Sequence, residues 1–414
     1  MKINVFGSNI SALVCAGCLA GTGNQVTLIG HRDNERSEPG LIKLLDTQID
    51  AERLVISTEY DIESEYQIIS FDPDQCGEGK HIARKLSKGN NPNRCIIIRS
   101  NFTMGSVKEI EQLSQIACVI NPDFASDGRA IQDFMRPDRI IIGSRNEQSL
   151  KQFKRLFAPF NRNRNVMIEM SPESAELTKY ATNAMLATRI SLMNELSLAA
   201  EHLGADIEEV RQGIGSDNRI GSSYLYAGIG FGGTHFAKDL CRIHQIINPS
   251  DAKEGLLEAV LRINEQQKEA LFRKIWQHFN CHIEDKIITL WGISYKPNSS
   301  SIEGAPSLTL IKAFLNQGAT VQIFDPMLDA QFMMWMRENI SLEQQKHLLI
   351  SSEMYEATEH SDALCVVTEW QPFLSPDLEK LKQTMRTPLI LDGRNLYDKQ
   401  WITENDFTYY GIGR

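Results

Sequence analysis

A glycine-rich stretch with polar residues behind it holds the side chains best suited to chemistry in this sequence. Four of the six residues in 228–233 are glycines, so the backbone can turn tightly and approach a ligand with no side chain in the way. A hydroxyl, an imidazole, an ammonium and a carboxylate follow at Thr234, His235, Lys238 and Asp239. An imidazole titrates near neutral pH, so His235 can act as a general base on water. The alternative is a plain loop between two helices, with His235 packed under the glycines.

A second candidate pair lies in a long helical pattern. Apolar residues recur at helical spacing from Pro172 to about Gly204, which predicts one very long helix with a buried face. Lys179 and Asn183 are four residues apart on this helix. They therefore share one face, and both can point at one ligand.

The composition is typical of a globular protein with more than one domain. A chain of 414 residues is too long for a single ordinary core, and 42% of its residues are hydrophobic. A net charge of −10, without long runs of Lys or Arg, argues against nucleic acid or a membrane surface as the partner. The eight cysteines are scattered, and Cys15 and Cys18, which two residues separate in an apolar helical run, are expected to be small core residues. We therefore expect no metal. Without a signal peptide or a long apolar run, we expect a cytoplasmic protein.

The first thirty residues predict the opening unit of a dinucleotide-binding domain. A strand at 2–6, a tight turn, a helix over about 10–19 and a strand at 25–29 follow one another. Further strands alternate with helices in the C-terminal part, at 286–292, 320–326, 363–367 and 389–392. This alternation predicts an α/β fold with two Rossmann-like, doubly wound parallel sheets, joined by the long central helix and a helical region.

The dinucleotide fingerprint is altered at two places. The expected Gly-x-Gly-x-x-Gly reads Gly7-Ser8-Asn9-Ile10-Ser11-Ala12. The side chain of Asn9 lies in the path by which a pyrophosphate reaches the backbone. The position of the acidic residue expected for the ribose hydroxyls is occupied by Gly30, and His31 and Arg32 follow it. This pattern indicates either a lost site or a site for the 2′-phosphate of NADP.

These motifs together resemble the UDP-glucose/GDP-mannose dehydrogenase family over the whole chain, and its UDP-glucose 6-dehydrogenase branch most. The glycine-rich stretch is similar to the family's Gly-x-Gly-Gly-x-Cys-x-x-Lys-Asp, and the long helix to its Leu-x-Lys-Tyr-x-x-Asn. Residues 121–128 resemble Asn-Pro-Glu-Phe-x-x-Glu-Gly, and 392–395 read Asp-Gly-Arg-Asn. The resemblance implies a dinucleotide-binding domain at 1–171, a helical dimerisation domain at 172–280 and a UDP-binding domain at 281–414.

The resemblance also implies roles for individual residues. The implied catalytic residues are His235, Lys179, Asn183, Asp239 and Asp123. The implied cofactor-binding residues, for NAD or NADP, are Gly7, Ile10, Arg32 and Asn101. The implied nucleotide-sugar residues are Phe124, Arg219, Tyr224, Leu225, Gly232, Lys296 and Arg394.

The residues that differ from the family pattern are those implied to bind the cofactor and to carry out catalysis, including the covalent step. In the family a cysteine nucleophile stands at the position of His235, a threonine that orders a catalytic water at Asn101, and an arginine that contacts the cofactor diphosphate at Glu303. We therefore predict a nucleotide-sugar-binding, catalytically impaired member that binds UDP-glucose and regulates or pairs with an active paralogue. The alternative is an active NAD(P)-dependent UDP-glucose 6-dehydrogenase that forms UDP-glucuronate or the aldehyde without a thiohemiacetal. Either form is expected to be a homodimer or higher oligomer.

Overall fold

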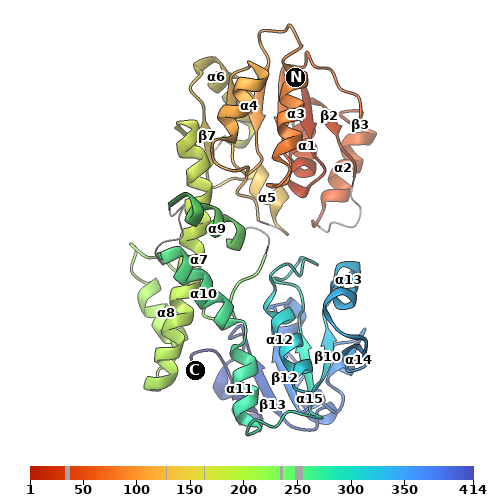
Figure 1. The fold of residues 1–414 in the computed structure, drawn as a ribbon, viewed down its shortest axis with the longest axis vertical. Helices are drawn as coiled ribbons and strands as arrows, with labels where there is room; N and C mark the ends of the chain where they lie inside the picture. The colour runs from red at the N-terminus through yellow and green to blue at the C-terminus, as the bar shows by residue number, and fades with distance from the viewer. Residues whose placement is uncertain (33–37, 127, 163, 234–235, 248–254) are drawn as a thin grey trace. The chain divides into compact units, whose positions relative to one another are not determined.

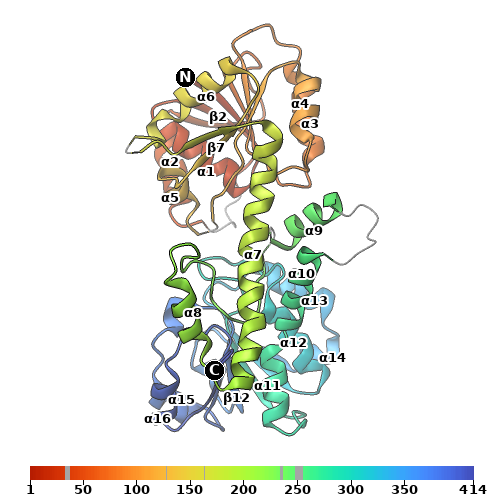
Figure 2. The same ribbon diagram turned by 90° about the vertical axis from the view of Figure 1, so that its left-hand side faces the viewer.

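The computed structural model describes residues 1–32, 38–126, 128–162, 164–233, 236–247 and 255–414. The chain forms two compact units, 1–182 and 183–414. The boundary between them falls within the predicted long helix, α7 (Pro172–Leu203). Figure 2 shows α7 as one continuous helix. None of the helices in these described ranges has the length and apolar character needed to cross a membrane.

The first unit is built on an eight-stranded sheet. Its strands lie in the order β3-β2-β1-β4-β5-β6-β7-β8, with bounds β1 Lys2–Phe6, β2 Gln25–Ile29, β3 Leu54–Ser57, β4 Tyr66–Ile69, β5 Cys95–Ile98, β6 Cys118–Ile120, β7 Ile140–Gly143 and β8 Met167–Met170. All neighbours are parallel except β6 and β7, which pair antiparallel at Ile120 and Gly143. The doubly wound parallel sheet predicted from the sequence is confirmed as far as β6.

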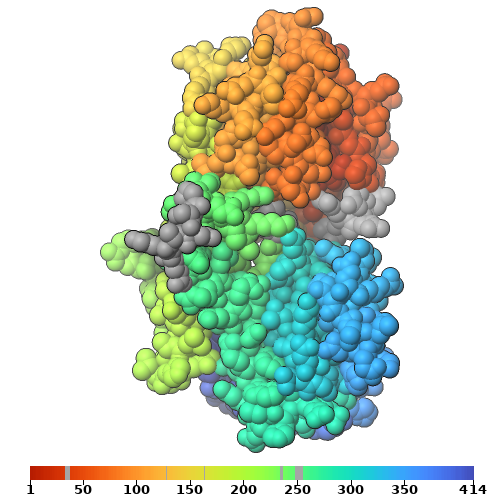
Figure 3. All heavy atoms as spheres, viewed as in Figure 1, coloured from red at the N-terminus to blue at the C-terminus, as the bar shows by residue number. Residues whose placement is uncertain are grey.

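Helices cover both faces of this sheet, because its strands are runs of buried aliphatic residues that need apolar partners on either side. The helices are α1 Ile10–Gly21, α2 Leu41–Asp50, α3 Cys76–Leu86, α4 Ser106–Ser114, α5 Ala130–Met135 and α6 Glu147–Phe157, with a 3₁₀ turn at Ala158–Phe160. Helices α1, α2, α5 and α6 share one core with the sheet, which includes Cys15 and Cys18 as predicted core residues. Helices α3 and α4 pack on the other face (Figure 1) and form much of the orange surface in Figure 3.

The second unit contains a six-stranded sheet in which every pair of neighbours is parallel. The order is β11-β10-β9-β12-β13-β14, with bounds β9 Ile287–Trp291, β10 Thr320–Phe324, β11 Leu348–Ile350, β12 Ala363–Val366, β13 Leu389–Asp392 and β14 Thr408–Tyr410. The helices are α8 Ile207–Gly215, α9 Phe236–Ile247, α10 Leu256–Gln267, α11 Ala270–His278, α12 Pro306–Asn316, α13 Ala330–Asn339, α14 Leu342–Gln345, α15 Leu378–Thr384 and α16 Lys399–Glu404, with 3₁₀ turns at Glu356–Thr358 and Gln371–Phe373.

Each sheet reverses its strand order at one place. The reversal lies between β1 and β4 in the first unit and between β9 and β12 in the second. In open α/β sheets, ligands bind outside the carboxyl ends of the strands at such a switch point. The loops that follow these strands are therefore where each unit is expected to hold a ligand.

Candidate dinucleotide and nucleotide-sugar sites

The turn after β1 keeps its first glycine for a steric reason. Gly7 has a positive φ of 138°, and a Cβ on it would lie 2.0 Å from the carbonyl oxygen of Ser70. Asn9 then caps α1, because its side-chain oxygen accepts the backbone N–H of Ala12 at 2.9 Å. The amide nitrogen of Asn9 donates to the carboxylate of Asp72 at 3.0 Å. Ile10, the first helical residue, packs with its side chain against the core.

The residues after β2 are also engaged within the chain. A Cβ on Gly30 would lie 2.4 Å from the carbonyl oxygen of Gly7, so this position has no room for the expected acidic side chain. Arg32 forms an ion pair with Asp46 at 2.5 Å. To bind a cofactor phosphate, the guanidinium of Arg32 would have to leave the carboxylate of Asp46. Cofactor binding by Arg32 therefore stays a prediction.

A small cavity brings together two of the predicted residues in the first unit. Asn101 and Lys179 line it, together with Glu176. The side-chain oxygen of Asn101 is buried and, within the described ranges, has no hydrogen-bond partner. The ammonium of Lys179 lies 5.1 Å from the ring centre of Phe124, a cation–π contact between two predicted residues.

Sequence reasoning missed Glu176, which stands one turn before Lys179 on α7. Its carboxylate accepts the backbone N–H groups of Gly105 at 3.0 Å and Val107 at 3.3 Å, and so caps α4. Burial raises the pKa of this carboxyl. The only signal in the sequence was its spacing, which puts Glu176 on the helical face that Lys179 and Asn183 share.

Asp123 is held by an arginine that the sequence did not single out. The guanidinium of Arg99 donates to it at 3.0 Å, and the N–H of Ala125 donates at 3.1 Å. Burial pushes the pKa of Asp123 upward, but the Arg99 charge and the hydrogen bonds outweigh it, and the pKa is lowered. The ion pair therefore stabilises the fold above the pKa of an unfolded Asp, and this contribution is lost as the pH falls through the lower folded value.

In the second unit two predicted residues meet directly. The amide of Asn183 donates to the carboxylate of Asp239 at 2.7 Å, and Asp239 is only 1% exposed. Arg242 lies 3.6 Å from the same carboxylate. His235 lies outside the described residues. Lys238, which follows it in the same motif, forms an ion pair with Glu303 at 2.8 Å.

The glycine-rich loop is held by three buried side-chain amides that sequence reasoning also missed. Asn194 accepts the N–H of Gly228 at 2.8 Å, and Gln267 donates to the carbonyl of Gly228 at 2.8 Å. Asn264 bonds both the N–H and the carbonyl of Phe231, at 2.8 and 3.1 Å. A Cβ on Gly232 would lie 2.8 Å from the carbonyl oxygen of Gly304. Packing alone therefore requires a glycine at 232.

Arg394 ties this loop to the second sheet. It stands two residues after the end of β13 and is 17% exposed. Its guanidinium donates to the carbonyls of Val367 at 2.7 Å and Gly230 at 3.2 Å, and it lies 3.3 Å from the carboxylate of Glu369. Lys296 stands in the loop after β9, with its ammonium 5.5 Å from the ring centre of Tyr295.

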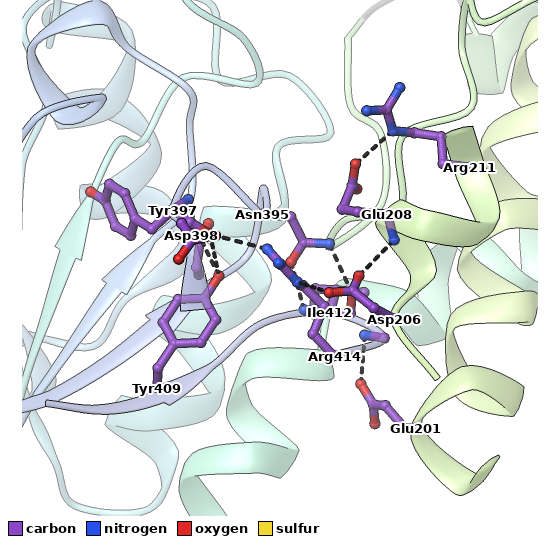
Figure 4. A network of polar contacts seen from close by, with 12 residues as sticks. Glu201, Asp206, Glu208, Arg211, Asn395, Tyr397, Asp398, Tyr409, Ile412 and Arg414 are labelled. Carbon is purple, nitrogen blue, oxygen red and sulfur yellow. Dashed lines mark hydrogen bonds and ion pairs between the residues drawn. The ribbon is translucent and has the colours of Figure 1, made fainter. Parts of the chain in front are cut away.

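The C-terminal residues brace the loop that carries Arg394. Asp392 is fully buried and accepts the N–H groups of Arg394 and Tyr397 and the hydroxyl of Tyr409, and burial raises its pKa. Figure 4 shows Arg414 donating to the carboxylate of Asp206 at 2.9 Å and to the carbonyl of Tyr397 at 3.0 Å. The loop after β13 is therefore held in place by Tyr409 and Arg414, which come later in the chain.

The remaining predicted residues differ in how they can meet a ligand. Arg219 is 90% exposed and pairs with Asp217 at 2.6 Å. Tyr224 is 39% exposed and has a positive φ of 60°. Leu225 is 3% exposed in the core of the second unit, so its side chain serves packing. Direct ligand contact by these three residues stays a prediction.

Family models match nearly the whole chain in three consecutive parts. They describe the NAD binding domain at residues 1–161, the central domain at 173–266 and the UDP binding domain at 289–399 of the UDP-glucose/GDP-mannose dehydrogenase family. The chain belongs to this family. The resemblance inferred from the sequence is confirmed.

Several relatives match over full length. The UDP-glucose 6-dehydrogenase of Pseudomonas aeruginosa is 36% identical, with 100% of this chain and 98% of the relative covered. The UDP-glucose 6-dehydrogenase TuaD of Bacillus subtilis is 30% identical, with 100% and 93% covered. The UDP-glucose dehydrogenase structure from Pyrobaculum islandicum superposes with a TM-score of 0.83 at 24% identity, covering 100% of this chain and 97% of that one. The structural likeness supports the fold.

As a member of this family, the chain carries the NAD binding domain at residues 1–161, which supports NAD as its cofactor, but its glycine turn offers the cofactor fewer backbone N–H groups. A dinucleotide pyrophosphate is normally bound by free backbone N–H groups where the first helix begins. In this chain Asn9 already takes the N–H of Ala12.

No group of three or more His, Cys, Asp or Glu residues able to hold a metal occurs in the described part of the chain.

Proposed function

We propose that this chain is a nucleotide-sugar-binding member of the UDP-glucose/GDP-mannose dehydrogenase family whose dehydrogenase step is impaired. The observation that carries the proposal is the glycine-rich loop. It is held by buried hydrogen bonds and by Arg394, whereas the nucleophile position of the same motif is His235. The bound sugar nucleotide is proposed to be UDP-glucose, because the UDP binding domain at 289–399 is present and the full-length relatives are named for that sugar.

The histidine removes the chemistry that a cysteine supplies. Oxidation of a sugar alcohol to an acid needs two hydride transfers, with the aldehyde held between them. A thiolate holds it as a thiohemiacetal, the second hydride transfer converts this adduct into a thioester, and water hydrolyses the thioester to the acid and the free thiol. An imidazole is a poorer trap, because its aldehyde adduct is charged and an acyl-imidazole is short-lived.

A second candidate function is an active dehydrogenase without a covalent intermediate. The buried pair between Asn183 and Asp239 favours it, because these groups remain together although the cysteine is absent. In that reaction His235 would act as a general base on water, and the aldehyde hydrate would be oxidised directly.

Calorimetric titration of the purified chain with UDP-glucose, UDP and NAD tests the proposal. We expect UDP-glucose to bind more tightly than NAD, and no NADH to form when both are supplied. NADH formation by the unaltered chain would favour the second candidate. Equal affinities for NAD and UDP-glucose would contradict the division between an intact sugar site and a weakened cofactor site.

We further propose that the chain is at least a homodimer through α7. Exposed apolar side chains form one stripe along this helix in the second unit, at Met185, Leu192, Leu196 and Leu203. Such a stripe is typical of a helix that packs against another surface. We propose that this surface is α7 of a second copy of the chain, and a monomer by light scattering at micromolar concentration would contradict the proposal.

A further inference from the structure

Two polar side chains meet where the first sheet reverses its strand order. Phe6, the last residue of β1, is paired with Ile69, the last residue of β4. Asn9 follows the first of these strands and Asp72 the second, and their side chains are hydrogen-bonded at 3.0 Å. They therefore occupy the switch point at which a parallel sheet of this order receives its ligand.

The pair makes one of the contacts that an anion would make there, and it adds a negative charge next to the residue that makes it. The first N–H groups of a helix lack partners within the helix, and the helix dipole favours negative charge beside them. The side-chain oxygen of Asn9 accepts one of these N–H groups, from Ala12 at 2.9 Å. Asp72 supplies a carboxylate, although the first turn of α1 has no acidic residue of its own.

We propose that Asn9 and Asp72 form an intramolecular cap that competes with a dinucleotide diphosphate for the N-terminus of α1. A diphosphate can accept the N–H of Ala12 only if the Asn9 side chain leaves it. It must also approach the carboxylate of Asp72, and like charges brought together oppose binding. The cap therefore lowers affinity for NAD through both a steric and an electrostatic term.

An independent contact closes the neighbouring ribose position. The hydroxyl of Ser8 accepts the N–H of His31 at 2.9 Å and lies 3.0 Å from its ring Nδ1. A Cβ on Gly30 would lie 2.6 Å from this hydroxyl oxygen. An acidic residue therefore cannot be restored at 30 unless the turn after β1 moves, so Gly30 is best kept in any attempt to reopen the site.

The inference concerns residues of the first unit only, so it is separable from the proposed sugar binding. Asp72→Asn removes the negative charge and keeps the shape of the cap. Asn9→Gly removes the amide side chain and so frees the N–H of Ala12. Titration with ADP-ribose should give binding about threefold tighter for Asp72→Asn, the scale of one charge at a helix terminus. It should be about tenfold tighter or more for Asn9→Gly with Asp72→Asn, in which the steric and charge terms are both removed. Adenosine has no phosphate, so its affinity should stay unchanged.

Asn146 provides a matched control. It caps α6 in the same way, accepting the N–H of Ser149 at 2.9 Å. Asn146→Gly should lower stability about as much as Asn9→Gly, by a few tenths of a kcal/mol, and leave ADP-ribose affinity unchanged. If the Asn9 variant fails to fold, Asp72→Asn alone decides. Unchanged ADP-ribose affinity in Asp72→Asn, or an equal gain for adenosine, would overturn the proposal.

Discussion

His235→Cys is expected to form no detectable UDP-glucuronate, although it restores the nucleophile that the family carries at this position. A thiolate can hold an aldehyde only after a first hydride has left the sugar, and that step requires a bound nicotinamide. The cap formed by Asn9 and Asp72 opposes the cofactor diphosphate in the first unit. In the second unit Glu303, which stands where the resemblance implies an arginine that contacts the cofactor diphosphate, forms an ion pair with Lys238.

The measurement is the absorbance of NADH with saturating UDP-glucose and excess NAD. The unaltered chain and His235→Cys should both give the background rate. A combined variant with Asn9→Gly, Asp72→Asn, His235→Cys and Glu303→Arg is the form expected to turn over, with Gly30 retained. If His235→Cys alone produced NADH, the cofactor site would be open in the unaltered chain and the missing thiol would be the whole defect.

Arg394→Ala should weaken UDP-glucose binding by about 1.5–3 kcal/mol, the usual loss of a hydrogen bond to a charged group. A guanidinium suits a diphosphate because its planar fork donates two hydrogen bonds at once. The same side chain holds the carbonyls of Val367 and Gly230. A loss of affinity could thus arise from the ligand contact or from displacement of the glycine-rich loop.

Two comparisons separate these causes. Uridine lacks the diphosphate, so Arg394→Ala should leave uridine affinity unchanged if Arg394 binds the phosphates directly. Arg394→Lys keeps the charge but loses the fork, and it should fall between Ala and the unaltered chain. Equal losses for uridine and UDP-glucose, together with a lower melting temperature, would assign Arg394 to loop support. Normal UDP-glucose binding by Arg394→Ala would exclude both roles.

The sequence by itself determined the elements and the family. The strands at 2–6, 25–29 and 389–392 and the helix from Pro172 were readable because each depends on local periodicity and turn residues. Paired positions on one helix were also within reach, since spacing alone puts Lys179 and Asn183 on a common face of α7. Asn9, Gly30 and Glu303 could be predicted from the sequence as departures from the family pattern, but their contacts within the chain could not.

Only the tertiary structure decided which of these residues have partners within the chain. Asn9 meets Asp72 across 63 positions of sequence, and Asp123 meets Arg99 across 24. Lys238 meets Glu303 in the same way. Such pairs cannot be derived from local pattern, because parallel strands and their crossovers bring distant loops to one edge of a sheet. Whether a polar side chain there is available to a ligand depends on the loop opposite it, and that loop belongs to another part of the sequence.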